Sequence, residues 1–262
     1  MVSDLRIKYQ RRIVCFLDIL GFGSLLKDFE DDADLNNEVN SPENLVSKKA
    51  NEFITAFKSV VQLIPHNYCR YYLFSDNICI AADMEEDKAI ANEILFVVSN
   101  LFQKMASLGY FMRGGIDYGW MLDEEDIAVG LPLAKAYLLE SKSAIYPRVV
   151  ISDTFRALLE DINADFDFQL KTDQELVYID PFYNVIRAED RREFFETYKA
   201  RISEKLEIHK GEPPIKQKFI WLALSFNNFL DQFLENSGIL LENEEVDEEE
   251  IEHLRNLKIE LL

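Results

Sequence analysis

The chain has 262 residues, of which 48% are hydrophobic, and it carries a formal net charge of −20. A chain of this length can bury one substantial core, whereas so acidic a protein is unsuited to nucleic acid, whose phosphates require a basic surface. No apolar run is long enough to cross a membrane, and the first residues do not resemble a signal peptide. Three cysteines, an odd number, lie in predicted strands, so the sequence predicts a cytoplasmic protein with reduced cysteines and neither nucleic-acid nor membrane partners.

The first third of the chain alternates between strand and helix patterns. Apolar strands are predicted at 12–18, 68–75 and 77–83, with a tight hairpin at Ser75-Asp76-Asn77. The helical spacing of apolar residues predicts a short helix at about 21–28 and a long one at about 43–64. The acidic, proline-containing stretch from Asp28 to Glu43 is interpreted as a loop.

The rest of the chain continues this alternation and then becomes helical. Helices are predicted at about 87–107 and 132–142, and strands at 109–118, 148–152 and 176–180. From about 187 onwards the pattern is helical. The element order predicts an α+β fold in residues 1–185, with a ferredoxin-like βαββαβ core sheet and helices on one face. Residues 186–262 are expected to form a helical C-terminal extension that packs on the core or on a dimer.

Two aspartates carry most of the chemical information. Asp18 ends the apolar strand Ile13–Leu17, and Asp76 follows the apolar strand Tyr71–Phe74. A buried carboxylate is costly unless a cation or hydrogen-bond donors meet it. Two of them on neighbouring strands predict a hard oxygen site for Mg²⁺ or Mn²⁺, although the capping of turns is an alternative. Residues 21–24 (Gly-Phe-Gly-Ser) could offer backbone N–H groups to phosphate oxygens at a helix start.

Four segments, in order, resemble the class III nucleotidyl cyclase catalytic domain. Residues 18–22 (Asp-Ile-Leu-Gly-Phe) resemble its first metal motif, and Asp76 corresponds to its second metal aspartate. Residues 112–119 (Met-Arg-Gly-Gly-Ile-Asp-Tyr-Gly) resemble the strand whose arginine binds the triphosphate, and residues 129–140 resemble its catalytic helix. The resemblance spans about residues 12–155, so residues 1–185 are expected to form a cyclase-like catalytic domain.

This resemblance implies a homodimer whose active sites are shared between the subunits. In each site Asp18, Asp76 and the Ile19 carbonyl would hold two Mg²⁺ or Mn²⁺ ions. Arg113 would bind the triphosphate, and Phe22 and Gly23 at the helix start would complete the phosphate site. Arg113 in a surface or interface ion pair is the alternative interpretation.

Several positions depart from the purine cyclase pattern. Tyr72 stands where the purine-reading lysine is expected, and Ile127 stands at or near the base-reading aspartate. Ala134 and Leu138 replace the asparagine and arginine of the catalytic helix. Lys135, one turn before Leu138, is a candidate replacement for the arginine, although a solvated lysine is the more common interpretation of such a residue.

These departures are similar to those of the pyrimidine cyclases of bacterial anti-phage (Pycsar) systems, as is Ala-Tyr-Leu-Leu-Glu at 136–140. The resemblance implies an enzyme that converts UTP to 3′,5′-cyclic UMP and pyrophosphate, with a cyclic-nucleotide-sensing effector acting through the product. Tyr72 would stack on the pyrimidine or restrict the pocket, and an ordinary core aromatic is the alternative. Formation of cyclic CMP from CTP, and a non-catalytic nucleotide-binding regulator, remain open.

Overall fold

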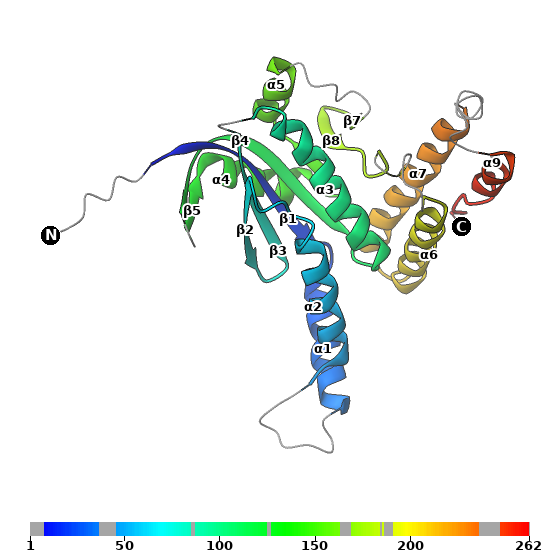
Figure 1. Ribbon diagram of the computed structural model, residues 1–262. Helices are drawn as coiled ribbons and strands as arrows, with labels where there is room; N and C mark the ends of the chain where they lie inside the picture. The colour runs from blue at the N-terminus through cyan, green and yellow to red at the C-terminus, as the bar shows by residue number, and fades with distance from the viewer. Residues whose placement is uncertain are drawn as a thin grey trace.

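The computed structural model describes residues 8–36, 46–84, 87–124, 127–162, 169–183, 185, 191–235 and 247–261. These residues form a mixed sheet with helices on both of its faces (Figure 1). Within them, no helix combines the length and the apolar character that crossing a bilayer requires. The three cysteines are buried and free, as the sequence predicts.

The central sheet has the strand order β2-β3-β1-β4-β6-β8-β7, with β5 paired to β4. Strand β1 lies in the middle and pairs antiparallel with both β3 and β4, whereas β4 and β6 run parallel. The strands are β1 (Gln10–Ile19), β2 (Cys69–Phe74), β3 (Asn77–Asp83), β4 (Met112–Glu124), β5 (Ile127–Gly130), β6 (Val149–Ile151), β7 (Leu170–Asp173) and β8 (Leu176–Ile179).

The helices of the first two thirds of the chain are α1 (Phe22–Asn36), α2 (Lys48–Val61), α3 (Ile90–Ser107), α4 (Leu131–Leu138) and α5 (Asp153–Asp161). A π-helical turn, η1 (Leu139–Ser143), follows α4. In Figure 1, α1 and α2 lie side by side and project beyond the sheet. Helix α1 continues to Asn36, so the prediction of a loop is wrong for residues 28–36. Residues 37–45 of the expected loop lie outside the described residues.

The two faces of the sheet are covered differently. Side chains alternate along a strand, and those of Ile13, Cys15 and Leu17 pack into the main core with α2 and α3. Val14 belongs to a smaller apolar cluster on the opposite face, which α4 covers through Leu133. The predicted α+β class is therefore confirmed. The helices were expected on one face of the sheet, whereas α4 packs on the opposite face from α2 and α3.

A glycine allows α4 to lie close against β4. A Cβ atom on Gly115 would stand 2.2 Å from the carbonyl oxygen of Ala136 and 2.5 Å from the Cβ of Leu139. No other residue fits there without moving the helix. Because α4 is held so closely, the side chains that follow it in η1 reach the end of β1 and β4.

The C-terminal part is helical, as predicted, with α6 (Arg191–Ile208), α7 (Pro213–Glu235) and α9 (Glu248–Arg255). Its buried residues continue the main core, and the Phe219 ring packs against Phe111 with centroids 5.4 Å apart. The predicted boundary at 185/186 adjoins residues 186–190, which lie outside the described residues. A division into two domains there stays a prediction.

Candidate metal and phosphate site

The candidate site lies where the end of β1 is next to the start of β4. Asp18 of β1 is directly opposite Arg113 of β4 in the antiparallel register. The Arg113 Nε atom donates to the Asp18 Oδ2 atom at 3.0 Å, and both side chains are largely buried. The aspartate that ends the first apolar strand therefore has a cation beside it, as the cost of burying its charge requires.

Asp76 comes to the same place from the β2–β3 turn. Phe74 and Asn77 are paired, so the turn is the two residues Ser75 and Asp76, and Ser75 has a φ of 57°. The carboxyl groups of Asp76 and Asp18 are hydrogen-bonded to each other. Burial, together with the neighbouring Asp18, raises the pKa of Asp76 to about 6. A carboxyl group whose pKa is raised in this way loses its proton readily when a cation binds beside it.

Glu140 is a third acid at the site, which we did not predict from the sequence. It is buried in η1, and its Oε1 atom lies 2.7 Å from the Arg113 Nη2 atom. Burial raises the pKa of Glu140, and the charge of Arg113 opposes that shift. The sequence does contain a signal, since Glu140 lies four residues after Ala136, on the helix face that α4 buries. Arg113 is thus held between two carboxylates.

Three further predicted residues lie beside the site and can reach it only through their backbones. The Ile19 side chain is buried in the main core on the opposite face, which leaves its carbonyl as the possible ligand. The Phe22 ring packs against Phe53 at 5.3 Å between centroids, so its backbone N–H is what remains available. Gly23 is exposed, and a Cβ there would meet nothing within 4 Å.

Lys135 is not brought to Asp18 and Arg113. Its Nζ atom lies 3.9 Å from Oδ2 of the buried Asp117, which also accepts a hydrogen bond from the Ser152 hydroxyl. Asp117 lies on the same face of β4 as Arg113, four residues further on. The neighbouring positions Ala134 and Leu138 are exposed, facing away from this chain's own sheet.

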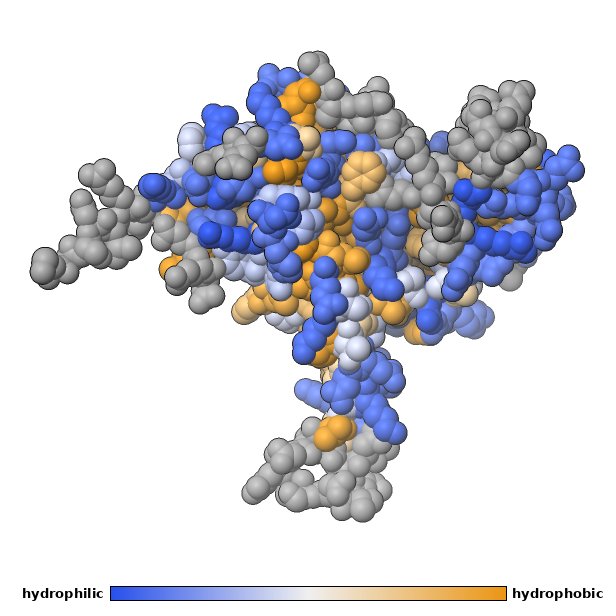
Figure 2. All heavy atoms as spheres, viewed as in Figure 1, coloured by the Kyte–Doolittle hydropathy of each residue, from blue (hydrophilic) through white to orange (hydrophobic). Residues whose placement is uncertain are grey.

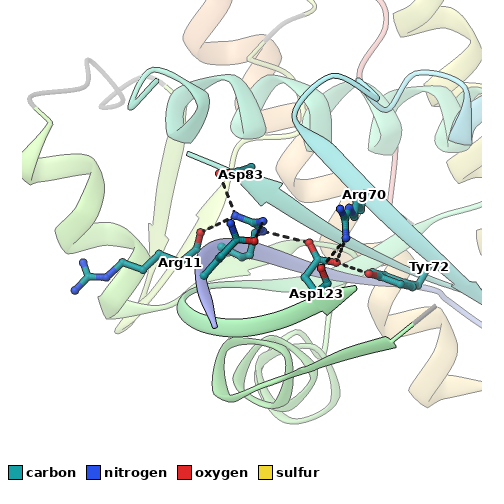
Figure 3. Close-up of polar contacts among 7 residues, drawn as sticks. Arg11, Arg70, Tyr72, Asp83 and Asp123 are labelled. Atoms are coloured by element: carbon teal, nitrogen blue, oxygen red, sulfur yellow. Dashed lines mark hydrogen bonds and ion pairs between the residues drawn. The ribbon is translucent and has the colours of Figure 1, made fainter. Parts of the chain in front are cut away.

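Tyr72 belongs to a polar network on the α4 side of the sheet (Figure 3). Its hydroxyl donates to an oxygen of the buried Asp123 carboxylate. The second oxygen of Asp123 accepts from Arg12 Nε at 3.2 Å, and the Asp123 carbonyl accepts from Arg70 Nη1 at 2.6 Å. Arg12 also lies 3.0 Å from Asp83. Tyr72 is therefore fixed in orientation and is not a freely rotating strand aromatic.

The ladder register relates Tyr72 to the acids. Tyr72 pairs with Cys79, which pairs with Phe16, two residues before Asp18. With strands about 4.8 Å apart and a rise of about 3.4 Å per residue, Tyr72 and Asp18 are roughly 12 Å apart between Cα atoms. A ribose and its phosphates can bridge such a span.

The residues at this site suit a divalent cation that is shared with phosphate. The described residues contain no cluster of three or more His, Cys, Asp or Glu side chains that would hold a metal alone. Asp18 and Asp76 nevertheless present hard oxygen atoms at hydrogen-bonding distance from each other. Mg²⁺ is typically held by one or two carboxylates together with substrate phosphates. The donor set therefore fits Mg²⁺ or Mn²⁺ bound with a polyphosphate.

No model of a known protein family matches the chain, and no curated protein sequence matches it either. Similar solved structures include the adenylyl cyclase CyaB from P. aeruginosa, 15% identical with a TM-score of 0.43 over 66% of this chain and 94% of that one. A bacterial light-regulated adenylyl cyclase is 14% identical, with a TM-score of 0.44 over 66% and 92%. The guanylyl cyclase domain of a RhoGC fusion protein from Blastocladiella emersonii is 12% identical, with a TM-score of 0.44 over 65% and 95%. Identities this low give no information on the substrate of the present chain.

Proposed function

We propose that this chain is a nucleotidyl cyclase that converts UTP to 3′,5′-cyclic UMP and pyrophosphate. The observation that carries the proposal is the meeting of the Asp18 and Asp76 carboxyls beside Arg113. A pair of acids next to an arginine at the edge of a sheet can hold divalent ions and a polyphosphate together. Phosphoryl transfer asks a protein mainly for such positioning and charge neutralisation.

In the proposed reaction the ribose 3′-oxygen attacks the α-phosphorus and forms the new O–P bond. The bond from the α-phosphorus to the bridging oxygen breaks, pyrophosphate leaves with that electron pair, and the hydroxyl proton passes to solvent. Asp18, Asp76 and the Ile19 carbonyl would hold two Mg²⁺ or Mn²⁺ ions, which lower the pKa of the attacking hydroxyl and neutralise phosphate charge. Arg113 would orient the triphosphate with its planar guanidinium group, while the N–H groups of Phe22 and Gly23 lie at the start of α1.

The proposed pyrimidine preference depends on Tyr72. The Tyr72 hydroxyl donates to Asp123, which fixes the orientation of the ring. The ring lies about one nucleotide length from Asp18 and Asp76 and would form one side of the base pocket. A fixed aromatic wall limits the depth available to a base and offers its face for stacking. A cytidylate cyclase remains the alternative, because both pyrimidines have the same size.

Replacing Tyr72 by Ala is expected to reduce the preference for UTP over ATP by about tenfold or more, since contacts of this kind contribute about 1–3 kcal/mol to discrimination. The measurement is the ratio of kcat/KM for the two nucleotides. Tyr71→Ala is the matched control, because Tyr71 packs on the other face with the main core and should leave the ratio unchanged. An unaltered ratio in Tyr72→Ala would remove Tyr72 from base selection.

We also propose that the enzyme works as a homodimer with shared sites. Large apolar side chains are exposed on the α4 side, where Phe74 is 81% exposed and Leu131 is 74% exposed. In Figure 2, hydrophobic side chains gather at the free end of the β2–β3 hairpin. A contiguous patch of exposed apolar groups is typical of an interaction surface. Ala134 and Leu138 are also exposed on α4, so a partner that covers Leu131 would meet α4 directly.

Leu131→Asp is expected to convert the dimer to a monomer and to lower activity by about a hundredfold, because sites assembled from two subunits lose their geometry. The measurement is light scattering after gel filtration, at matched protein concentration, followed by the activity assay. Leu224→Asp, which changes a similarly exposed leucine on α7, is the control and should remain dimeric. A dimeric and active Leu131→Asp protein would place the interface elsewhere.

The cellular role is proposed on the resemblance to pyrimidine cyclases of anti-phage systems. The product would act in the cytoplasm as a second messenger for a cyclic-nucleotide-sensing effector. The alternative, a non-catalytic nucleotide-binding regulator, is favoured by one observation, namely that α4 carries Ala134 and Leu138 at the positions of the family's asparagine and arginine. Under that alternative the acids would bind a nucleotide without turning it over.

The proposal is tested by pyrophosphate release from UTP in the presence and absence of Mn²⁺. We expect release that requires Mn²⁺ and that is abolished by EDTA. An Asp87→Asn protein, altered at an acid remote from the site before α3, is the control and should behave as wild type. Tight UTP binding without any pyrophosphate release would instead support the regulator.

A further inference from the structure

Lys218 of α7 lies between two residues of the same helix that contact segments beside the candidate site. Ile215, three residues before it, lines a cavity of about 130 Å³ together with Leu20 and Gly21, which directly follow β1. Trp221, three residues after it, stacks on Tyr146 with centroids 5.2 Å apart. Residues three apart on a helix share one side. Lys218 is thus placed between the end of β1 and the segment that precedes β6.

The second of these contacts leads directly to the neighbour of Arg113. The Arg148 guanidinium lies over the Trp221 ring at 5.5 Å, and the Arg148 carbonyl accepts from the Gly114 N–H at 3.0 Å. Gly114 is adjacent to Arg113 in β4. Helix α7 therefore runs past both strand ends from which Asp18 and Arg113 project.

The charges of the site act on Lys218. Burial lowers the pKa of Lys218, the positive charge of Arg113 lowers it further, and the negative charge of Asp18 acts in the opposite direction. Lys218 is half-buried, and among the described residues no hydrogen bond or ion pair to its ammonium group is formed. Arg113, by contrast, contacts both Asp18 and Glu140.

Burial and the charge of Arg113 both disfavour the charged form of Lys218, so an anion bound nearby would stabilise its ammonium group. The acids of the site are already paired, Asp18 with Arg113 and with Asp76, and Glu140 with Arg113. Since the described acids of the site already have partners, a bound ligand that carries several negative charges would compensate Lys218. A polyphosphate has this character, and charged oxygen atoms accept strong hydrogen bonds from an ammonium group.

We propose that Lys218 binds the β- and γ-phosphates of the nucleotide, so that the C-terminal extension supplies a cation to the site; this rests on the function proposed above. The leaving pyrophosphate gains charge in the transition state, and a fixed cation from α7 would stabilise it there.

The test compares Lys218→Gln with Lys216→Gln, a half-buried lysine two residues earlier on the same helix. Inorganic tripolyphosphate with Mn²⁺ is titrated into each protein by calorimetry. We expect Lys218→Gln to weaken tripolyphosphate binding by about tenfold, as the loss of one charge-assisted contact predicts. Lys216→Gln should stay within about twofold of wild type, and Lys218→Arg should retain most of the affinity because it keeps the charge.

The outcomes separate this inference from the proposed function. A wild-type protein that binds neither tripolyphosphate nor any nucleoside triphosphate overturns the proposed function itself. A wild-type protein that binds, with Lys218→Gln binding equally well, overturns only the role of Lys218. Circular dichroism and a thermal melt check the fold of each variant. Lys218→Met, which keeps the aliphatic stem, replaces the glutamine variant if that protein does not fold.

Discussion

Asp76→Asn is expected to abolish pyrophosphate release, by about a thousandfold or more, while making the metal-free protein more stable at neutral pH. The loss of activity follows because a metal-holding carboxylate contributes several kcal/mol to charge neutralisation in the transition state, and each 1.36 kcal/mol is tenfold in rate. The gain in stability follows because the substitution removes the carboxyl group of Asp76, which the fold holds close to the carboxyl group of Asp18.

The sign of the stability effect depends on pH. The pKa of Asp76 rises from its ordinary value of 3.8 to about 6 in the folded protein. The folded state therefore binds this proton more tightly, and its stability falls as the pH rises from about 4 to about 6. Because Asp76 is partly exposed, solvent screening reduces the effect to about 1 kcal/mol at pH 7.5, or about 3 °C in Tm.

Thermal melts of wild type and Asp76→Asn at pH 7.5 and pH 4.5, both in EDTA, measure this effect. We expect the variant to melt higher at pH 7.5 and the difference to shrink at pH 4.5. Added Mn²⁺ should raise the Tm of wild type but not that of the variant, since ligands stabilise the state that binds them. A variant that is both active and unaffected in these melts would contradict the metal site.

Arg113→Met is expected to lose both stability and activity, and a second substitution should restore only the stability. Removing Arg113 leaves the buried Glu140 carboxylate without its cation, and breaking a buried pair in this way costs about 3 kcal/mol. Activity should fall by about a hundredfold or more, because an electrostatic contact to the phosphates is lost.

The double variant Arg113→Met with Glu140→Gln separates the two effects. Glutamine carries no charge, so we expect most of the free energy of unfolding to return while catalysis remains lost. Urea unfolding curves and the pyrophosphate assay on all four members of the cycle provide the measurement. Recovered activity in the double variant would show that Arg113 acts only through the fold and not on the substrate.

The sequence predicts those residues of the site that a strand pattern or a short motif identifies. A shared site for Asp18 and Asp76 was predicted on the condition that their strands lie side by side. Strand β3 lies between β1 and β2, and the β2–β3 turn is what brings Asp76 to Asp18. Arg113 was predicted from its strand motif and lies directly opposite Asp18 in the register. Their catalytic roles stay predictions.

Long-range contacts account for what the sequence did not indicate. Asp123 begins an acidic stretch beyond the strand predicted at 109–118, but β4 continues through Asp123, so its side chain is buried against Tyr72 and Arg12. Lys218 follows Arg113 by about a hundred residues, and tertiary contacts such as Phe219 on Phe111 and Trp221 on Tyr146 bring its helix to this end of the sheet. Lys135 faces Asp117 instead of the acids, because α4 is docked on Gly115 in a fixed position.

The most direct measurement is product identification by mass spectrometry after purified protein is incubated with ATP, GTP, CTP and UTP separately, each with Mn²⁺. We expect 3′,5′-cyclic UMP and pyrophosphate from UTP, with cyclic CMP as the next product and little from the purines. Cyclic AMP or cyclic GMP as the main product would contradict the role assigned to Tyr72. A failure of all four nucleotides to yield a cyclic product, with nucleotide still bound, would contradict the cyclase itself.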